Sequence, residues 1–438
     1  MTKIRRMSVF LVLLSSVISI ATGVALDSNS PAGMANFRAV YYGARCLLQH
    51  EDPYQESEFL SVYRQQGGEF PSDPGKRRLF LRAVPVCVNL PTTLVLITPF
   101  ALLTWGAAHV IWLILLAVSF ILAAVLMLDL SRRAANDVSL ALICILLANS
   151  QVLFAVGNTA GIAVSFCVVA VWCFLKDRCV PVGVLCLAIS LALKPHDSGL
   201  VWFYFLLAGG SHRRRALQTL VVAVALALPA ILWVSNVAPQ WIQELKSNLS
   251  ATSARGDISD PGPDSISRKG SSDVIIDLRS LISVFRDNPR IYNTVSYFIC
   301  GSLLLVWSLT TIRSHGSPAT IWYALASIAA LSMLATYHRP YDAKLLLLAC
   351  PACAMLWDDG GSIGKLALLI TSAAVTLTGD IPLAVVALLT KNLNVSTMGL
   401  FTKIFTVPLI RPAPLVLLVM AIFYLLVYMR RTLRSVSL

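Results

Sequence analysis

Long apolar stretches recur along the chain and are separated by shorter polar segments. A helix of about 20 apolar residues crosses the roughly 30 Å hydrocarbon core of a bilayer. Hydropathy on this basis predicts about twelve spans, near residues 9–26, 84–104, 107–130, 138–156, 159–175, 181–208, 216–235, 291–313, 318–336, 341–357, 364–388 and 413–430. The pattern therefore predicts an all-α, polytopic transmembrane helical protein, with residues 1–438 in a single transmembrane domain.

The composition excludes a water-soluble globule. Hydrophobic residues make up 57% of the 438 residues and charged residues only 13%, whereas a typical soluble domain is about 25% charged. Too few charges remain to cover a soluble surface. The first apolar stretch, 9–26, is longer than the roughly 7–15 residues of a signal-peptide core, so we interpret it as a retained first helix.

Basic residues gather at the ends of the predicted helices. The net charge is +13, with clusters at Lys3/Arg5/Arg6, Arg213/Arg214/Arg215 and Arg430/Arg431/Arg434. The positive-inside rule explains such clusters, so we expect contact with membrane lipids and no nucleic acid. An even number of spans between two basic ends predicts that both termini are cytoplasmic.

Strict alternation of the twelve spans places Arg132, Arg133 and Arg313 on the outer side. The positive-inside rule disfavours that placement. Either the alternation fails locally, where the short span 159–175 is the weakest, or these cations have a function on the outer side.

Two polar segments are long enough to fold outside the spans. Residues 27–83 form the first outer loop, where Phe37, Val40, Tyr41, Ala44 and Leu48 share one face of a helix. This pattern predicts a helix lying in the membrane interface, with a second short helix around 57–65. Residues 236–290 form a second large loop, rich in Ser, Gly, Asp and Pro. We expect it on the outer side, either as a lid or as a passive connector.

Ionisable side chains inside apolar stretches mark candidate functional positions. Lys194, His196 and Asp197 surround Pro195 near the middle of span 181–208. A lysine at a helix centre costs about 2.5–3.5 kcal/mol on insertion scales. Lys194 therefore either pairs with Asp197 or faces a polar cavity that binds an anionic ligand.

A second cluster lies between two predicted spans, at Tyr337, His338, Arg339, Tyr341 and Asp342. His338 or Asp342 offers a base, Arg339 a phosphate-binding cation, and the tyrosines can stack on a sugar ring. The alternative is an ordinary aromatic belt at the membrane interface. The amides of Gln151 and Asn158, beside Gly157, either line the same cavity or form a simple turn.

Several classes of site are missing from the sequence. There is no P-loop, no dinucleotide-binding glycine motif, no H-E-x-x-H and no G-x-S-x-G. Cys350 and Cys353 form a C-x-x-C pair inside an apolar helix without a second pair or a histidine nearby. We expect no metal site, no cofactor and no ATP-driven chemistry.

An ordered series of short motifs runs through most of the chain. It comprises 36–45 (NFRAVYYGAR), Asp52-Pro53-Tyr54, Asn89-Leu90-Pro91, 99–103 (PFALL), Ala108, Trp112, Gly157-Asn158, Leu193-Lys194-Pro195, Arg213-Arg214-Arg215 and the His338 cluster. In this order the series resembles glycosyltransferase family 87 of the GT-C superfamily. That family contains polyprenyl-phosphate-sugar-dependent transferases, including the mycobacterial α-1,2-mannosyltransferases of phosphatidylinositol mannoside synthesis.

The resemblance implies a GT-C-like fold in a bacterial cytoplasmic (inner) membrane. It implies transfer of a hexose, typically mannose, from a polyprenyl-phosphate-linked donor to a cell-envelope glycolipid or glycan acceptor at the outer face, with inversion at the anomeric carbon. The donor phosphate is expected to contact Arg339, Arg132 or Arg133, and the donor site to include Lys194, His196, Tyr341 and Tyr54.

The chain departs from the family pattern at Asn36, where the family usually has an aspartate that acts as general base. An amide cannot accept a proton at neutral pH, so Asp27, Asp52, Asp342 or His338 takes that role, or the chain is inactive. Two other functions remain open at this point. A secondary transporter would show a similar number of spans, and a non-catalytic lipid-binding relative would explain Asn36.

Overall fold

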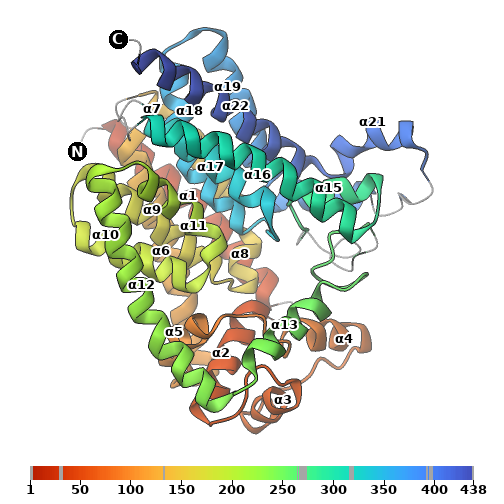
Figure 1. Ribbon diagram of the computed structural model, residues 1–438. Coiled ribbons are helices and arrows are strands. Elements are labelled where there is room, and N and C mark those ends of the chain that lie inside the picture. Colours follow the sequence, from red (N-terminus) through yellow and green to blue (C-terminus); the bar gives the residue numbers. More distant parts are fainter. Residues whose placement is uncertain are drawn as a thin grey trace.

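The computed structural model describes residues 3–28, 33–131, 134–263, 265, 274–314, 320–390, 393 and 398–436. The regular elements in these ranges are all helices (Figure 1). The predicted all-α class is therefore confirmed for the described part of the chain.

Five helices are long and apolar enough to cross a membrane. They are α1 (Lys3–Ser28), α6 (Trp105–Ser131), α12 (Gly210–Val237), α16 (Pro289–Ser314) and α22 (Pro412–Val436). A sixth span results if α19 (Gly361–Leu377) and α20 (Asp380–Thr390), which meet at an angle of 69°, are counted together. Twelve continuous spans are thus not found among the described residues, because several of the predicted ones are broken helices.

The predicted span 181–208 is a helical hairpin rather than one span. It consists of α10 (Val180–Leu193) and α11 (Pro195–Leu207), separated at Lys194. The indole of Trp202 in α11 donates to the carbonyl of Ala216 at 2.9 Å, and the first turns of α10 also line a cavity with the first half of α12. Both outer ends of the hairpin therefore lie beside the start of α12. Each arm is only about 20 Å long at 1.5 Å per residue, too short to cross a bilayer.

Three more predicted spans are interrupted. Residues 138–156 fold as α7 (Asn136–Ala148) and α8 (Gln151–Val156), and Gly157, at a φ of +62°, turns the chain into α9 (Ala160–Lys176). Beyond α17 (Ile321–Ala335), residues 341–357 form the 3-10 helix η1 (Asp342–Ala349) and α18 (Cys350–Asp358). The predicted span 84–104 contains one short helix, α5 (Pro91–Ala101), and its other residues are not helical.

The interrupted helices bring their inner ends together. The amide of Asp380, at the start of α20, donates to the carbonyl of Asn149 at the end of α7 at 3.4 Å. Lys344 of η1 donates to the same carbonyl at 2.7 Å. Polar backbone groups freed at the helix breaks thus satisfy one another inside the protein, as a membrane environment requires.

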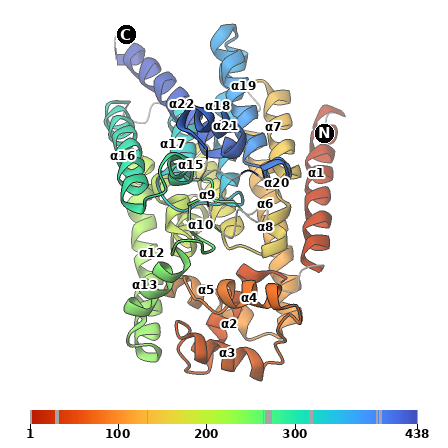
Figure 2. The same ribbon diagram turned by 90° about the vertical axis from the view of Figure 1, so that its right-hand side faces the viewer.

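The polar loops pack at the end of the molecule opposite the two termini (Figures 1 and 2). This layer contains α2 (Ala35–Leu48), α3 (Glu56–Gln65), α4 (Pro74–Ala83) and α13 (Trp241–Thr252), and the remaining short helices are α15 (Leu278–Phe285) and α21 (Leu400–Ile410). The helices expected in the first loop are present. The apolar face of α2 is buried in protein, however, instead of lying on lipid: the ring of Phe37 stacks on Trp112 of α6 with centroids 4.6 Å apart.

Strict alternation placed Arg313 on the side opposite the two termini, and the structure contradicts that placement. The hydroxyls of Ser314, at the end of α16, and Tyr428, near the end of α22, lie 2.7 Å apart. Arg313 therefore lies at the end of the molecule that carries both termini (Figure 2). The parity failed because hairpins such as α10–α11 reverse before they cross. Arg132 and Arg133 lie outside the described residues.

Trp112 joins the first loop to the helical body, since its indole also donates to the carbonyl of Gly157 at 2.9 Å. It is 1% exposed. We expect Trp112→Ala to lower the free energy of unfolding by about 3–5 kcal/mol, the range for large aromatic truncations. Thermal unfolding in detergent micelles measures this loss. Trp357→Ala, at a position 39% exposed, is the control and is expected to change stability little; equal losses in the two variants would contradict the assignment.

Candidate functional site

Lys194, at the break between α10 and α11, is the centre of a buried charged cluster. Its ammonium group contacts the carboxylate of Asp342 and lies 3.6 Å from Oδ2 of Asp197. The side chains of the two aspartates are 1% exposed and that of Lys194 is 12% exposed. The ammonium also lies 5.0 Å from the ring centroid of Tyr341. The structure thus joins both clusters found in the sequence, which are more than a hundred residues apart.

His338 lies between two hydrogen-bond acceptors. Its Nδ1 is 2.9 Å from the carbonyl of Thr336, and its Nε2 is 3.4 Å from Oδ1 of Asp197. Nε2 makes no hydrogen bond in this geometry, whereas Nδ1 lies at hydrogen-bond distance from its carbonyl neighbour. The role of His338 as a base stays a prediction.

His196, Asp197 and His338 form a group whose candidate ligand atoms all lie within 4.8 Å of one another. Two histidines and a carboxylate are a ligand set that zinc accepts. Lys194 Nζ, however, is already 3.6 Å from the same carboxylate, so a lysine cation balances the charge that a metal ion would neutralise. We keep the expectation that the site functions without a metal.

The turn at Lys194 is held by two hydroxyl groups of α5. Thr92 Oγ1 donates to the carbonyl of Ala192 at 2.5 Å, and Thr93 Oγ1 donates to that of Leu193 at 3.0 Å. The last carbonyls of a helix lack partners within the helix, and Pro195 has no N–H to offer. The threonines supply the missing donors. They follow the Asn89-Leu90-Pro91 motif directly. The motif therefore begins the helix that positions these two hydroxyl groups.

The large loop 236–290 reaches the cluster. Arg339 Nη2 donates to the carbonyl of Ile258 at 2.7 Å, and the amide of Ile276 donates to the carbonyl of His338 at 3.0 Å. The amide of Arg339 also donates to Oδ2 of Asp342 at 2.7 Å. The described parts of this loop therefore contact the segment that carries His338 and Arg339, and its role as a lid or as a passive connector stays a prediction.

Asp380, at the start of α20, is a further buried acid, and it lies beside the turn at Asn149. Oδ2 of Asp380 accepts the amide of Val152 at 2.7 Å and so caps α8. The amides noted in the sequence serve the same turns: Gln151 donates to the carbonyl of Ala148 at 2.5 Å, and Oδ1 of Asn158 accepts the amide of Ala160 at 2.8 Å. These bonds match the simple-turn alternative. Asp380 was missed in the sequence, although a charge within an apolar stretch was the available signal.

Asp27, at the end of α1, pairs with a residue outside the Lys194 cluster. Its Oδ2 is 3.0 Å from Nε2 of His109 in α6, and its Oδ1 is buried without a hydrogen-bond partner. The carboxylate lies against Gly33, three residues before Asn36, which is half-buried in the first turn of α2. His109 was not singled out in the sequence, because it lies in the long apolar stretch 107–130.

Asp52 and Tyr54 belong to the loop layer. Oδ1 of Asp52 accepts the amide of Tyr54 at 2.8 Å, and the Tyr54 hydroxyl donates to the carbonyl of Asn89 at 2.9 Å. Burial, together with a hydrogen bond to Asp52, raises the pKa of Glu244 in α13 to about 7. Asp52 is therefore one of a group of acids between α13 and the first loop, and one route from it to the Lys194 turn runs through Tyr54, Asn89 and α5.

The ion pair between Lys194 and Asp342 gives a direct test of the cluster. Lys194→Met is expected to destabilise the protein by about 3–5 kcal/mol, because removing one partner leaves a buried charge uncompensated. The double variant Lys194→Met/Asp342→Asn should recover part of that loss, as measured by thermal unfolding. Lys176→Met is the control, because Lys176 makes a more exposed pair with Asp129 and should cost under about 1 kcal/mol. A double variant no more stable than the single one would contradict this account.

Comparison with known proteins agrees with the family resemblance. No curated protein and no solved structure gives a significant match. The model of glycosyltransferase family 87 matches residues 89–336, which is more than half of the chain. The match contains Lys194 and Asp197 and ends just before His338. The chain belongs to glycosyltransferase family 87, and it is a membrane glycosyltransferase that takes a sugar donor and an acceptor.

Proposed function

We propose that this protein moves a hexose, mannose in the first instance, from a polyprenyl-phosphate-linked donor to a cell-envelope glycolipid or glycan acceptor at the outer face of the membrane. The observation that carries the proposal is the buried cluster of Lys194, Asp197, His338 and Asp342 where the interrupted helices meet. Such a cluster is costly to build inside a membrane protein and tends to mark function.

The cluster can stabilise a phosphate leaving group. Lys194 presents a cation at a fixed position beside Asp342, and Arg339, three residues before Asp342, supplies a second. Preorganised cations lower the energy of a transition state in which negative charge develops. The guanidinium of Arg339 at present bonds the carbonyl of Ile258, and phosphate oxygens are stronger acceptors for it. The ring of Tyr341 lies beside the ammonium group of Lys194, and we propose that it contacts the sugar.

We assign the general base to Asp27. The acceptor oxygen attacks C1 of the hexose, the bond from C1 to the phosphate oxygen breaks, Asp27 takes the proton of the acceptor hydroxyl, and polyprenyl phosphate leaves. Among the candidate carboxylates, Asp342 faces Lys194 and Asp52 bonds the Tyr54 amide. Asp27 keeps one oxygen without a partner, and its carboxylate lies against Gly33, three residues before Asn36, where the family's aspartate normally stands.

The arrangement of loops supports cytoplasmic termini and an outer-face reaction. The basic groups Arg213 to Arg215 lie at the start of α12, and Arg430, Arg431 and Arg434 lie in the last turns of α22, at the end that carries the termini (Figure 2). The positive-inside rule puts that end in the cytoplasm. The loop layer with α2, α3 and α13 then faces outward, in a bacterial cytoplasmic membrane.

Asn36 favours one alternative, a relative that binds the lipid-linked sugar without transferring it. Family membership gives no support to a secondary transporter. The two remaining functions differ in a single observable, the appearance of a glycosylated acceptor.

A transfer assay with radiolabelled polyprenyl phosphate mannose and membranes containing the protein tests the proposal. Asp27→Asn is expected to lower the rate about 10²–10⁴-fold, the usual contribution of a general base. Asp177→Asn, at an exposed position paired with Arg215, is the matched control and should keep the wild-type rate. We expect the wild-type rate to persist in EDTA.

Other outcomes identify the alternatives. Full activity of Asp27→Asn with activity lost in Asp52→Asn or Asp342→Asn would move the base to that residue. Donor binding by the wild type without any product would establish the non-catalytic relative.

A further inference from the structure

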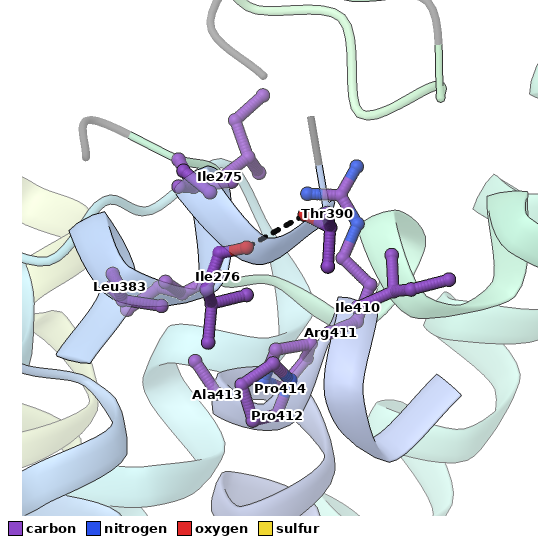
Figure 3. A pocket seen from close by; sticks show the side chains of 12 residues that line it. Ile275, Ile276, Leu383, Thr390, Ile410, Arg411, Pro412, Ala413 and Pro414 are labelled. Carbon is purple, nitrogen blue, oxygen red and sulfur yellow. Dashed lines mark hydrogen bonds between the residues drawn. The ribbon is translucent and has the colours of Figure 1, made fainter. Parts of the chain in front are cut away.

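Two hollows in the structure differ in the size of molecule that they admit. The first lies between residues 274–276, α20 and the junction of α21 and α22 (Figure 3), and its volume is only about 20 Å³. That space is enough for about one water molecule. Its charged residue, Arg411, already lies with Nη2 3.4 Å from the carbonyl of Pro261. This cavity therefore has no room for a ligand.

The second hollow is an open groove between α10 and the first half of α12, and its volume is about 890 Å³. That volume is within the range of about 300–1,000 Å³ that small-molecule sites occupy. The floor of the groove is aliphatic, with Val184 and Leu185 on the side of α10 and Leu217, Val221 and Val222 on the side of α12. Such a floor suits a hydrocarbon chain.

Arg213 and Arg214 line the same groove at the start of α12, ahead of its aliphatic residues. Both side chains are exposed. Nε of Arg213 donates to the carbonyl of Leu206 at 3.2 Å, and within the described residues Arg214 makes no hydrogen bond or ion pair. The described residues that line the groove include no acid. The groove thus combines a positively charged mouth with an apolar floor.

The third arginine of this motif has a different role. The guanidinium of Arg215 donates to the carbonyl of Phe174 and to the carboxylate of Asp177, and so joins the start of α12 to the end of α9. Arg213 and Arg214 are therefore the two cations of the motif that the described part of the chain leaves without a carboxylate.

The groove lies on the side of the molecule away from the loop layer. α12 is long and apolar enough to cross a membrane, and at its far end Val234 and Ala238 pack in one apolar cluster with Tyr54 of the loop layer. A helix of 28 residues separates its two ends by about 42 Å at 1.5 Å per residue. In the orientation proposed above, the arginines therefore lie at the cytoplasmic leaflet, whose surface carries anionic lipids.

We infer that the groove between α10 and α12 binds an anionic phospholipid, with the lipid phosphate at Arg213 and Arg214 and an acyl chain along the aliphatic floor. Guanidinium groups pair with phosphate oxygens through charge-assisted hydrogen bonds, and basic pockets between transmembrane helices bind anionic head groups. α10 begins in this groove and ends at Lys194, so the bound lipid braces the helix that leads to the candidate site. The inference takes only the membrane orientation from the proposed function and does not depend on sugar transfer.

Native mass spectrometry of the full-length protein, released from detergent micelles, measures the inference by counting bound lipids. Dioleoyl phosphatidylglycerol is the probe, and dioleoyl phosphatidylcholine, with the same chains and no net charge, is the comparison. We expect one molecule of phosphatidylglycerol to bind at least tenfold more tightly than phosphatidylcholine, and Arg213→Gln/Arg214→Gln to remove that preference. Arg430→Gln/Arg434→Gln removes two exposed arginines from the last turns of α22 and, as the matched control, should keep the wild-type affinity.

Filling the groove tests its aliphatic floor separately from its charge. Leu217→Trp places an indole among the lining residues and should weaken phosphatidylglycerol binding with both arginines in place. Leu232→Trp, at an exposed position farther along the same helix, is its control. Thermal unfolding of each lipid-free variant shows whether it is folded.

Three results would overturn the inference. One is equal affinity of the wild type for the two lipids, and another is wild-type affinity for phosphatidylglycerol in folded Arg213→Gln/Arg214→Gln or Leu217→Trp. The third is a dimer that these substitutions dissociate, because a second copy of the chain would then occupy the groove.

Discussion

One constraint shapes the structure: the positive charge of the buried Lys194 must be balanced by nearby carboxylates. Lys194 is carried into the protein by an apolar hairpin, and it is accommodated because Asp197 and Asp342 approach it from two different elements. Neither aspartate is stable there alone, since an isolated charge in a low-dielectric interior costs far more than a paired one. The three side chains therefore fix the positions of α10, α11 and η1 relative to one another. The ring of His338 lies against the same carboxylate, with Nε2 3.4 Å from Oδ1 of Asp197.

The helix breaks have the same origin. A helix end inside the membrane leaves carbonyls and amides without partners, and the breaks at Lys194 and between α7 and α8 are matched by donors or acceptors from another element. Thr92 and Thr93 serve the end of α10, Asp380 serves the start of α8, and Lys344 serves the end of α7. The buried polar groups of the described residues therefore gather where these interrupted helices meet.

The sequence predicted this layer only in part, and the residues show why. The α-helical class, the helix 35–48 and the two charged clusters were evident, because periodicity and charges inside apolar stretches are local signals. The reversal at Lys194 was not, since hydropathy averages over a window and cannot distinguish one span of 28 residues from two half-length arms. Pairing between Lys194 and Asp342, 148 residues apart, depends on tertiary structure. His109, Arg411 and Asp380 were overlooked as single polar residues within apolar segments, and only their partners give them meaning.

The central claim is that the cluster of Lys194, His338 and Arg339 binds the phosphate of a lipid-linked sugar. A cryo-electron microscopy map of the protein with a non-transferable phosphonate analogue of polyprenyl phosphate mannose tests it most directly. The account predicts phosphonate density within about 3 Å of the Arg339 guanidinium, a hydrogen-bonding distance, with the head group beside His338. Density for the head group elsewhere, for example at Arg213 and Arg214, with the cluster unchanged, would contradict the account.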